Sequence, residues 1–241
     1  MKNSLVSLAK KKRLPDVQRM DKETLEWIRA NEPIFKTAKK IILPPRFFME
    51  QFVPPADWFL KKRHTDSIHG VRHLLRVGIN IVIAARIFSF KENIETLLVA
   101  GILHDVRREN DKADPSHGLR AARWFRQNRT IVGRRCRLRF TRSDVEKIYW
   151  SIVFHELPRS EIIKDRRYLE YKQYIDIVRM ADALDRYRLP KLKWWINDEI
   201  LGMNTPDVAK KTAYDLVIRS EEFFLRGNTS KESVLNILPA K

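Results

Sequence analysis

Residues 94–107 contain the segment that most constrains how this chain can fold. The letters LLVAGIL (97–103) form an uninterrupted apolar run, and His104 and Asp105 follow it directly. A helix that is apolar on nearly every side has to be enclosed by other elements, so the run predicts a central buried helix. An imidazole and a carboxylate are therefore expected side by side at the end of a buried helix.

The remainder of the chain also shows helical rather than strand periodicity. Between residues 67 and 88, apolar residues recur at helical spacing, as in Val71, Leu74 and Leu75. Further helices are expected over residues 21–30, 116–127, 143–155, 168–187 and 206–225, with Ser116 and Ser143 as N-caps of two of them. Sustained strand alternation is absent from the sequence and glycine is scarce, with 7 residues. The predicted fold class is all-α, a helical bundle.

The 241 residues divide into three predicted parts. Residues 1–65 are expected to be a basic N-terminal extension that packs on the core, since their two Pro-Pro pairs interrupt any long helix. Within this extension, residues 1–13 are expected to be frayed. Residues 66–190 carry the longest helical patterns and form the predicted main domain, and residues 191–241 are expected to complete the bundle.

Net charge is the unusual property of the composition. The chain has 48 lysines and arginines against 30 acidic residues, a formal net charge of +18. Residues 115–143 include nine arginines and no acidic residue. Such an excess favours an anionic partner through electrostatic steering and counterion release. A phosphate-containing substrate is the preferred interpretation, nucleic acid is a second, and ordinary solvated surface charge is the simplest.

Cysteine content and hydropathy bear on the cellular compartment. A single cysteine, Cys136, excludes an intramolecular disulfide framework and fits a reducing environment. No apolar run approaches the roughly 18 residues of a membrane-spanning helix, and the apolar centre of the N-terminus is too short for a secretory signal. These features predict a cytoplasmic protein, and the sequence leaves its oligomeric state open.

Histidines and aspartates recur on the segments that are predicted to face the core. In chain order, the candidate metal ligands are His73, His104, Asp105, His117, His155 and Asp182. Burying an unpaired imidazole or carboxylate costs on the order of several kcal/mol, which a divalent cation would offset for all of them together. Histidine and carboxylate ligands without thiolates suit Fe, Mn, Zn, Co or Ni. The number of ligands favours two ions, about 3.5–4 Å apart and bridged by a carboxylate.

The order His73, His104-Asp105 and Asp182 resembles the HD superfamily of metal-dependent phosphohydrolases, whose pattern is H…HD…D on a helical bundle. The similar segments are HGVRHLLRV (69–77), GILHDVRR (101–108) and VRMADALDRYR (178–188). In the last of these, the family's ligand follows an alanine, which favours Asp182 over Asp185. The segments SHGLRAA (116–122) and SIVFHELP (151–158) resemble the additional ligand segments of two-metal branches, which implies His117 and His155 as ligands. The resemblance covers residues 67–190, about half of the chain, and leaves ordinary surface or supporting roles to His64 and His69.

The resemblance implies a phosphohydrolase that cleaves a phosphoester or phosphoanhydride of a nucleotide-type substrate. In this interpretation, Asp105 bridges two ions, the first set of ligands is His73, His104 and Asp182, and the second is His117 and His155. The predicted catalytic residues are His104, Asp105 and Arg108, and the predicted substrate-binding residues are Arg108, Arg120 and Arg186. Each of these arginines lies three or four residues after a candidate ligand, a spacing that brings two side chains to one helical face. The planar guanidinium suits bidentate binding of phosphate.

Three alternatives to a small-molecule phosphohydrolase stay open. The basic segment 115–143 also suits a nuclease or nucleic-acid-binding protein of the same fold. The six-ligand order also resembles that of di-iron oxygenases within the superfamily, and the ligands alone do not separate oxygen chemistry from hydrolysis. A basic adaptor with a structural metal site is the non-enzymatic alternative. The cyclic-dinucleotide phosphodiesterase branch is disfavoured, because Phe154-His155 holds one histidine and no Gly-Tyr-Pro stretch follows.

Overall fold

The computed structural model describes residues 3–240, apart from the side chain of Asp198. Within this range the chain forms twelve α-helices, short 3-10 turns and no strand, so the all-α prediction is confirmed. The helices are α1 (Leu5–Lys10), α2 (Lys22–Ala30), α3 (Arg46–Glu50), α4 (Val71–Ile87), α5 (Ile94–Leu103), α6 (His117–Cys136), α7 (Arg142–Phe154), α8 (Arg159–Ile162), α9 (Arg166–Leu184), α10 (Asp198–Leu201), α11 (Asp207–Leu225) and α12 (Ser230–Leu235). None of the described helices is both long enough and apolar enough to cross a bilayer.

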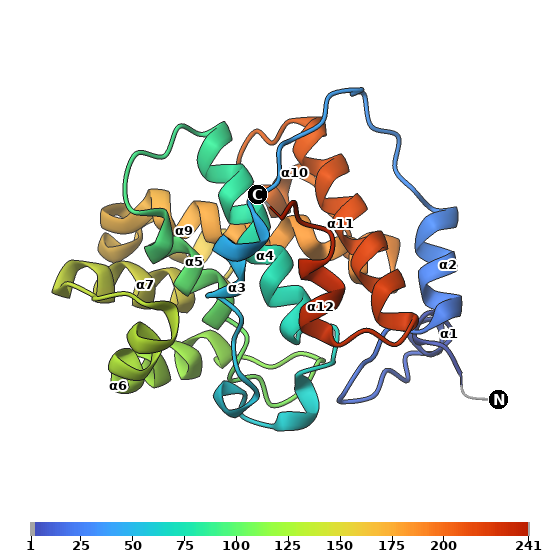
Figure 1. The fold of residues 1–241 in the computed structure, drawn as a ribbon, viewed down its shortest axis with the longest axis horizontal. Coiled ribbons are helices and arrows are strands. Elements are labelled where there is room, and N and C mark those ends of the chain that lie inside the picture. Colours follow the sequence, from blue (N-terminus) through green and yellow to red (C-terminus); the bar gives the residue numbers. More distant parts are fainter. Residues whose placement is uncertain (1–2, 241) are drawn as a thin grey trace.

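Helix α4 lies in the middle of the bundle, with α5 and α9 on one side and α11 and α12 on the other (Figure 1). Every residue from Val71 to Ala85 is buried. Because the polar residues of α4 are enclosed together with the apolar ones, this helix carries His73, Arg72 and Arg76 into the protein interior. The bundle therefore holds charged groups at its centre as well as an apolar core.

Helix α5 is the apolar segment predicted from the sequence, and it is buried from Thr96 to Leu103. It packs against α4, α7 and α9. Gly101 permits its close approach to α4, because a Cβ atom at this position would lie 2.4 Å from Ile81 Cδ1. The regular helix ends at Leu103, and a turn then carries His104 and Asp105, both buried.

Helices α6 and α7 form a hairpin whose boundaries differ from the sequence-based expectation. Helix α6 was expected to end near residue 127 but continues to Cys136, with non-helical dihedral angles at Asn128. The longer helix is stabilised by buried residues of its second half, among them Val132 and Cys136, which lie between arginines in the sequence. The N-cap prediction for Ser143 is wrong, because Thr141 caps α7 in a capping box with Asp144.

Ser116 occupies the predicted N-cap position of α6 but does not cap the helix with its side chain. Its φ is 68°, in the left-handed region, and its side chain makes no capping hydrogen bond to α6. The left-handed backbone at Ser116 turns the chain so that His117 becomes the first residue of α6.

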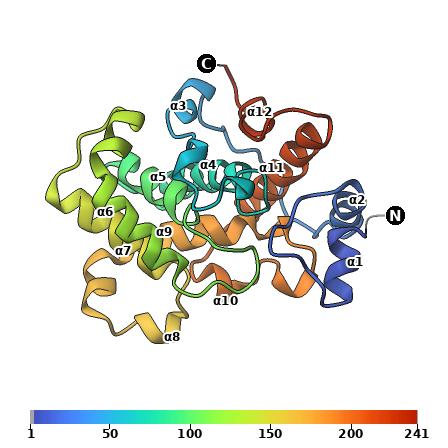
Figure 2. The ribbon, with the colours of Figure 1, turned by 90° about the horizontal axis from the view of Figure 1, so that it is seen from below.

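The expectation that residues 1–13 are frayed is wrong for residues 3–13, and residues 1 and 2 lie outside the described part of the chain. Residues Leu5–Lys10 form α1, capped by the side chain of Ser4, and Leu5, Val6 and Ala9 of this helix are buried. The Leu5 backbone N–H donates to Asp21 Oδ2 over 2.8 Å. In Figure 2, α1 and α2 lie together at one edge of the molecule. The N-terminal extension is thus ordered from α1, which packs against α2.

Candidate metal centre

The six candidate ligands come from five separate parts of the chain and meet between α4, α5, α6, α7 and α9. His73 lies on α4 and Asp182 on α9, while His104 and Asp105 follow α5 directly. His117 is the first residue of α6, and His155 is the C-cap of α7. All except Asp182 are buried residues, and the Asp182 side chain is 25% exposed. Asp182 therefore marks the side of the cluster that is open to solvent.

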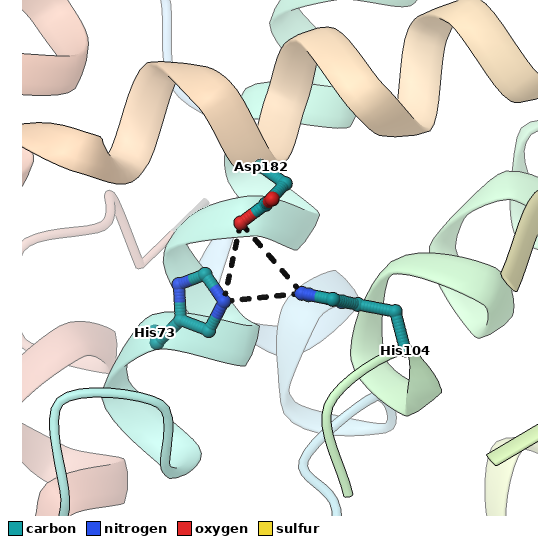
Figure 3. Close-up of side chains that lie close together, drawn as sticks. All are labelled: His73, His104 and Asp182. Atoms are coloured by element: carbon teal, nitrogen blue, oxygen red, sulfur yellow. Dashed lines mark hydrogen bonds and ion pairs between the residues drawn. The ribbon is translucent and has the colours of Figure 1, made fainter. Parts of the chain in front are cut away.

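His73, His104 and Asp182, here called the first donor set, point toward one another (Figure 3). The Nε2 atoms of His73 and His104 are 3.1 Å apart. Asp182 Oδ1 lies 3.4 Å from His73 Nε2 and 3.7 Å from His104 Nε2. Bonds of about 2.0–2.2 Å from one ion to such ligands would place the ligand atoms roughly 3.0–3.5 Å from one another. This set could hold a metal ion with little rearrangement.

His117 and His155, with Asp105 Oδ1, form the second donor set. The two Nε2 atoms are 3.0 Å apart, and Asp105 Oδ1 lies 2.9 Å from that of His117 and 3.8 Å from that of His155. The other oxygen, Asp105 Oδ2, lies 3.5 Å from His73 Nε2 and 3.7 Å from His104 Nε2. The Asp105 carboxylate thus spans both sets, with one oxygen directed to each.

The chemistry of the four imidazoles explains why these clusters suit a cation. Each Nδ1 lies 2.6–2.8 Å from an acceptor: Asp185 Oδ2 for His73, and the carbonyl oxygens of Gly101, Asp114 and Ile152 for His104, His117 and His155. The carbonyl oxygens, and the Asp185 carboxylate beside His73, accept, so each Nδ1 carries a proton. In its neutral form, each ring then directs the Nε2 lone pair to the centre. Two lone pairs facing each other at 3.0–3.1 Å repel unless a positive charge lies near them.

The pKa values of His104, His117 and Asp182 are shifted in the directions that favour positive charge on the histidines and negative charge on the aspartate. Burial alone would lower the pKa of His117, but the carboxylates of Asp105 and Glu156 raise it to about 9. Burial likewise opposes protonation of His104, yet Asp105 and Asp182 raise its pKa. Although burial favours the neutral acid, His104 holds the pKa of Asp182 well below its ordinary value. A site of this kind stabilises cations.

A cavity of about 930 Å³ opens onto the centre. Asp105, His117, His155 and Asp182 lie in its wall. Six basic side chains line it as well: Arg108, Lys112, Arg159, Arg179, Arg186 and Arg188. The wall is completed by Leu14 and Gln18 of the N-terminal extension and by Trp194, Asn197, Glu199 and Ile200, so segments outside the predicted main domain contribute to the cavity. The cavity combines candidate metal ligands with cationic walls.

Of the three predicted substrate-binding arginines, two line the cavity and one does not. Arg108 and Arg186 line the cavity. Arg186 Nε donates to the Trp194 carbonyl oxygen over 2.6 Å, and no other described residue hydrogen-bonds its Nη atoms. Arg120 does not line the cavity, because its Nη2 is held by the Asp114 carboxylate at 2.6 and 2.7 Å. The prediction placed Arg120 by helical spacing alone, and the competing carboxylate draws it away from the centre.

Several supporting residues were missed by the sequence analysis. Asp185, considered there only as a competitor of Asp182, instead orients His73 by accepting from its Nδ1 over 2.8 Å. Glu156 Oε2 lies 2.7 Å from His117 Nδ1, and Glu156 Oε1 accepts from the Gly118 backbone N–H over 2.8 Å. Arg179 donates to the carbonyl oxygens of His155 and Leu157. Each lies within three residues of a candidate ligand, and that proximity was the available signal.

The two histidines without an assigned ligand role are both near this region. His69 lines the cavity, and its Nδ1 lies 3.0 Å from Asp111 Oδ1. Burial lowers the pKa of His69 to about 3, so this ring is neutral. His64 is buried, and its Nδ1 lies 3.2 Å from the Arg108 carbonyl oxygen. Neither belongs to the two donor sets.

No protein-family model matches the chain, and searches of curated proteins and of solved structures give no significant match.

Proposed function

We propose that this protein is a metal-dependent phosphohydrolase of the HD superfamily. The observation that carries the proposal is the pair of donor sets joined by Asp105, with four Nε2 lone pairs directed inward and a basic cavity above them. The order and local sequence of these residues also resemble the HD pattern. Metal, reaction class and substrate class are all part of this proposal.

His73, His104 and Asp182 of the first donor set would hold a divalent cation, and that ion would supply Lewis-acid chemistry for a phosphoryl group and a water of lowered pKa. The chain's own residues prepare the site. Asp185 and the Gly101 carbonyl oxygen fix the orientation of His73 and His104 by accepting from their Nδ1 atoms. The partly exposed Asp182 lines the cavity, so a substrate would approach the first donor set from this side.

The cavity walls provide for the charge of the substrate. Arg186 keeps its Nη groups without a described protein partner, and a planar guanidinium can hold a phosphate through two parallel hydrogen bonds. Arg188 is buried and donates through Nε to the Ile68 carbonyl oxygen over 2.7 Å. The cavity volume of about 930 Å³ lies at the upper end of the 300–1,000 Å³ or so that is usual for small-molecule sites. A nucleotide-sized phosphate compound suits both properties.

The direct test is a panel of nucleotides and phosphoesters, offered to protein loaded in turn with Mn²⁺, Fe²⁺, Co²⁺, Ni²⁺ and Zn²⁺. We expect release of phosphate or a nucleotide with at least one metal, and loss of this activity after treatment with a chelator. Oxygen uptake is followed in the same samples under Fe²⁺. Oxygen consumption without phosphate release would indicate an oxygenase, and the absence of any phosphoester cleavage would refute the phosphohydrolase.

A matched pair of variants tests the role of the cavity arginines. In Arg186→Gln, we expect KM for the best substrate of the panel to rise about tenfold with a smaller change in kcat, since one charge-assisted contact is lost. Arg120→Gln removes the same charge outside the cavity and is expected to leave KM within about twofold. Equal effects of the two substitutions would show that general charge, and not contact with the substrate, is responsible.

A second candidate, nucleic-acid binding, is favoured by a separate hollow formed by the second half of α6 and the segment that follows this helix. This arginine hollow has a volume of about 550 Å³ and is lined by Arg129, Arg134, Arg137 and Arg139, among others. Among the described residues, no carboxylate forms an ion pair with any of the four. A surface of uncompensated arginines attracts a phosphodiester backbone.

Salt dependence distinguishes nucleic-acid binding from a merely soluble basic surface. We expect single-stranded RNA or DNA to bind with an affinity that falls steeply with salt. The triple substitution of Arg134, Arg137 and Arg139 by Gln should reduce the slope of log K against log salt by about 2. The triple substitution of Lys10, Lys11 and Lys12 by Gln removes equal charge from an exposed helix end and should change the slope much less. No binding at low salt would exclude this candidate.

A further inference from the structure

Arg108 contacts the second donor set but not the first, so the two sets differ in how readily they can bind a cation. Its Nη1 lies 3.2 Å from His117 Nε2 and 3.3 Å from Asp105 Oδ1. These two atoms belong to the second donor set, so a guanidinium already lies against the groups that a second ion would need. In the described part of the chain, no arginine nitrogen lies within hydrogen-bonding distance of a ligand atom of the first donor set.

The position of Arg108 is built into the fold. The Arg108 side chain is 10% exposed. Its Nε donates to the Asn110 carbonyl oxygen over 3.2 Å, and its Nη2 donates to the Lys112 carbonyl oxygen over 2.8 Å. The loop that carries these carbonyl groups is fixed in turn by Asp111, whose Oδ2 accepts from the Gln18 backbone N–H over 2.7 Å. The guanidinium is therefore held between the loop carbonyl groups and the contacts with Asp105 and His117.

We propose that Arg108 serves as a built-in cation that competes with the second metal ion. A guanidinium donates only, so at this position it occupies one oxygen of Asp105 and, when His117 is neutral, the lone pair of His117 Nε2. A divalent ion in the second donor set has to displace it and meets its charge at close range. The protein thus holds one ion firmly in the first donor set and a second one only weakly. The inference rests on the proposed metal centre and concerns the number of ions that it holds.

Metal binding without substrate provides the test, with Mn²⁺ as the probe. Equilibrium dialysis gives the number and affinity of bound ions, and electron paramagnetic resonance distinguishes isolated Mn²⁺ from coupled pairs. For the wild-type chain we expect one tight ion, an uncoupled six-line spectrum, and a second ion at least about tenfold weaker. For Arg108→Met we expect the second ion to bind at least about tenfold more tightly, equivalent to about 1.4 kcal/mol, with spectral features of a coupled pair.

Two further variants separate charge from structure. Arg108→Lys keeps the charge, so its second ion should stay weaker than that of Arg108→Met. Arg107→Met removes a neighbouring arginine that donates to the Trp58 carbonyl oxygen and does not line the cavity, and it should match the wild type. Circular dichroism and thermal melting establish that each variant is folded.

The role of Arg108 and the existence of the metal centre would be overturned by different results. Two ions of equal affinity in the wild-type chain, or a second ion that Arg108→Met does not strengthen, would overturn the role of Arg108 and leave the metal centre intact. If Arg108→Met does not fold, the number and affinities of the Mn²⁺ ions bound by the wild-type chain alone test the role of Arg108. The absence of any bound ion in the wild-type chain would overturn the metal centre and this inference together.

Discussion

Asp105→Asn is expected to abolish metal-dependent phosphohydrolysis, with a loss of at least about 10³-fold in kcat/KM, or about 4 kcal/mol of transition-state stabilisation. The substitution preserves the shape of the side chain but removes the charge shared by both donor sets. Arg108 and His117 both contribute to holding the pKa of Asp105 well below its usual value against the effect of burial, so the side chain is a carboxylate at neutral pH. The amide of Asn cannot replace that charge.

The measurement is initial rate against metal concentration, with the best substrate from the nucleotide panel. Glu109→Gln is the matched control, because Glu109 belongs to the same loop but its side chain is 55% exposed. We expect it to retain wild-type rates. A folded Asp105→Asn protein that keeps more than about a tenth of the wild-type rate would be incompatible with a bridging role for this carboxylate.

Glu221→Gln is expected to destabilise the fold by about 3–5 kcal/mol, the usual cost of breaking one side of a buried ion pair. Glu221 is 1% exposed. Its Oε2 accepts from Arg72 Nε over 2.9 Å, and its Oε1 accepts from Arg76 Nη1 over 2.7 Å. With a neutral side chain in this place, both guanidinium groups stay in the core with insufficient negative charge. Chemical unfolding of the metal-free protein measures the change.

The neighbouring residue supplies the control for this stability prediction. Glu222 forms an ion pair with Arg29 at the surface, where the two side chains are 30% and 42% exposed. Solvent screens such pairs, so Glu222→Gln should cost no more than about 1 kcal/mol. If the two substitutions have equal effects, the buried network contributes no more than a surface pair.

This buried network also connects the C-terminal part of the chain to the metal centre. Arg76 Nη2 donates to Asp185 Oδ2 over 3.0 Å, and the same oxygen accepts from His73 Nδ1. Arg76 thereby joins Glu221 on α11 to the residue that orients His73. Helix α11 is thus part of the support of the first donor set, although it contributes no ligand.

The elements that the sequence predicts well are those whose burial is complete. Helix α5 is apolar on all sides, so its identity and its buried position follow from composition alone. Helix α1 was missed because only three of its six residues, Leu5, Val6 and Ala9, are buried, and basic residues surround them. The end of α6 was misplaced because its buried residues Val132 and Cys136 stand among arginines that mask the apolar pattern.

At the candidate site, the residues that cluster could be selected from sequence and their supporting partners could not. Candidate metal ligands have a restricted chemistry and a recurring local context, so His73, His104, Asp105 and Asp182 stand out. The role of Asp185 as a partner of His73 depends on the direction of its side chain at the end of α9, which the sequence does not reveal. Arg120 shows the same limit, since its pairing with Asp114 follows from the path of a loop.

The candidate metal centre is tested most directly by a crystal of the full chain soaked in Mn²⁺, with data collected at the manganese absorption edge. We expect an anomalous peak about 2.0–2.3 Å from His73 Nε2, His104 Nε2 and an oxygen of Asp182. In the Asp105→Asn variant, this peak should weaken or disappear. Full manganese occupancy elsewhere on the molecule, with no peak among these three residues, would show that the first donor set is not a metal site.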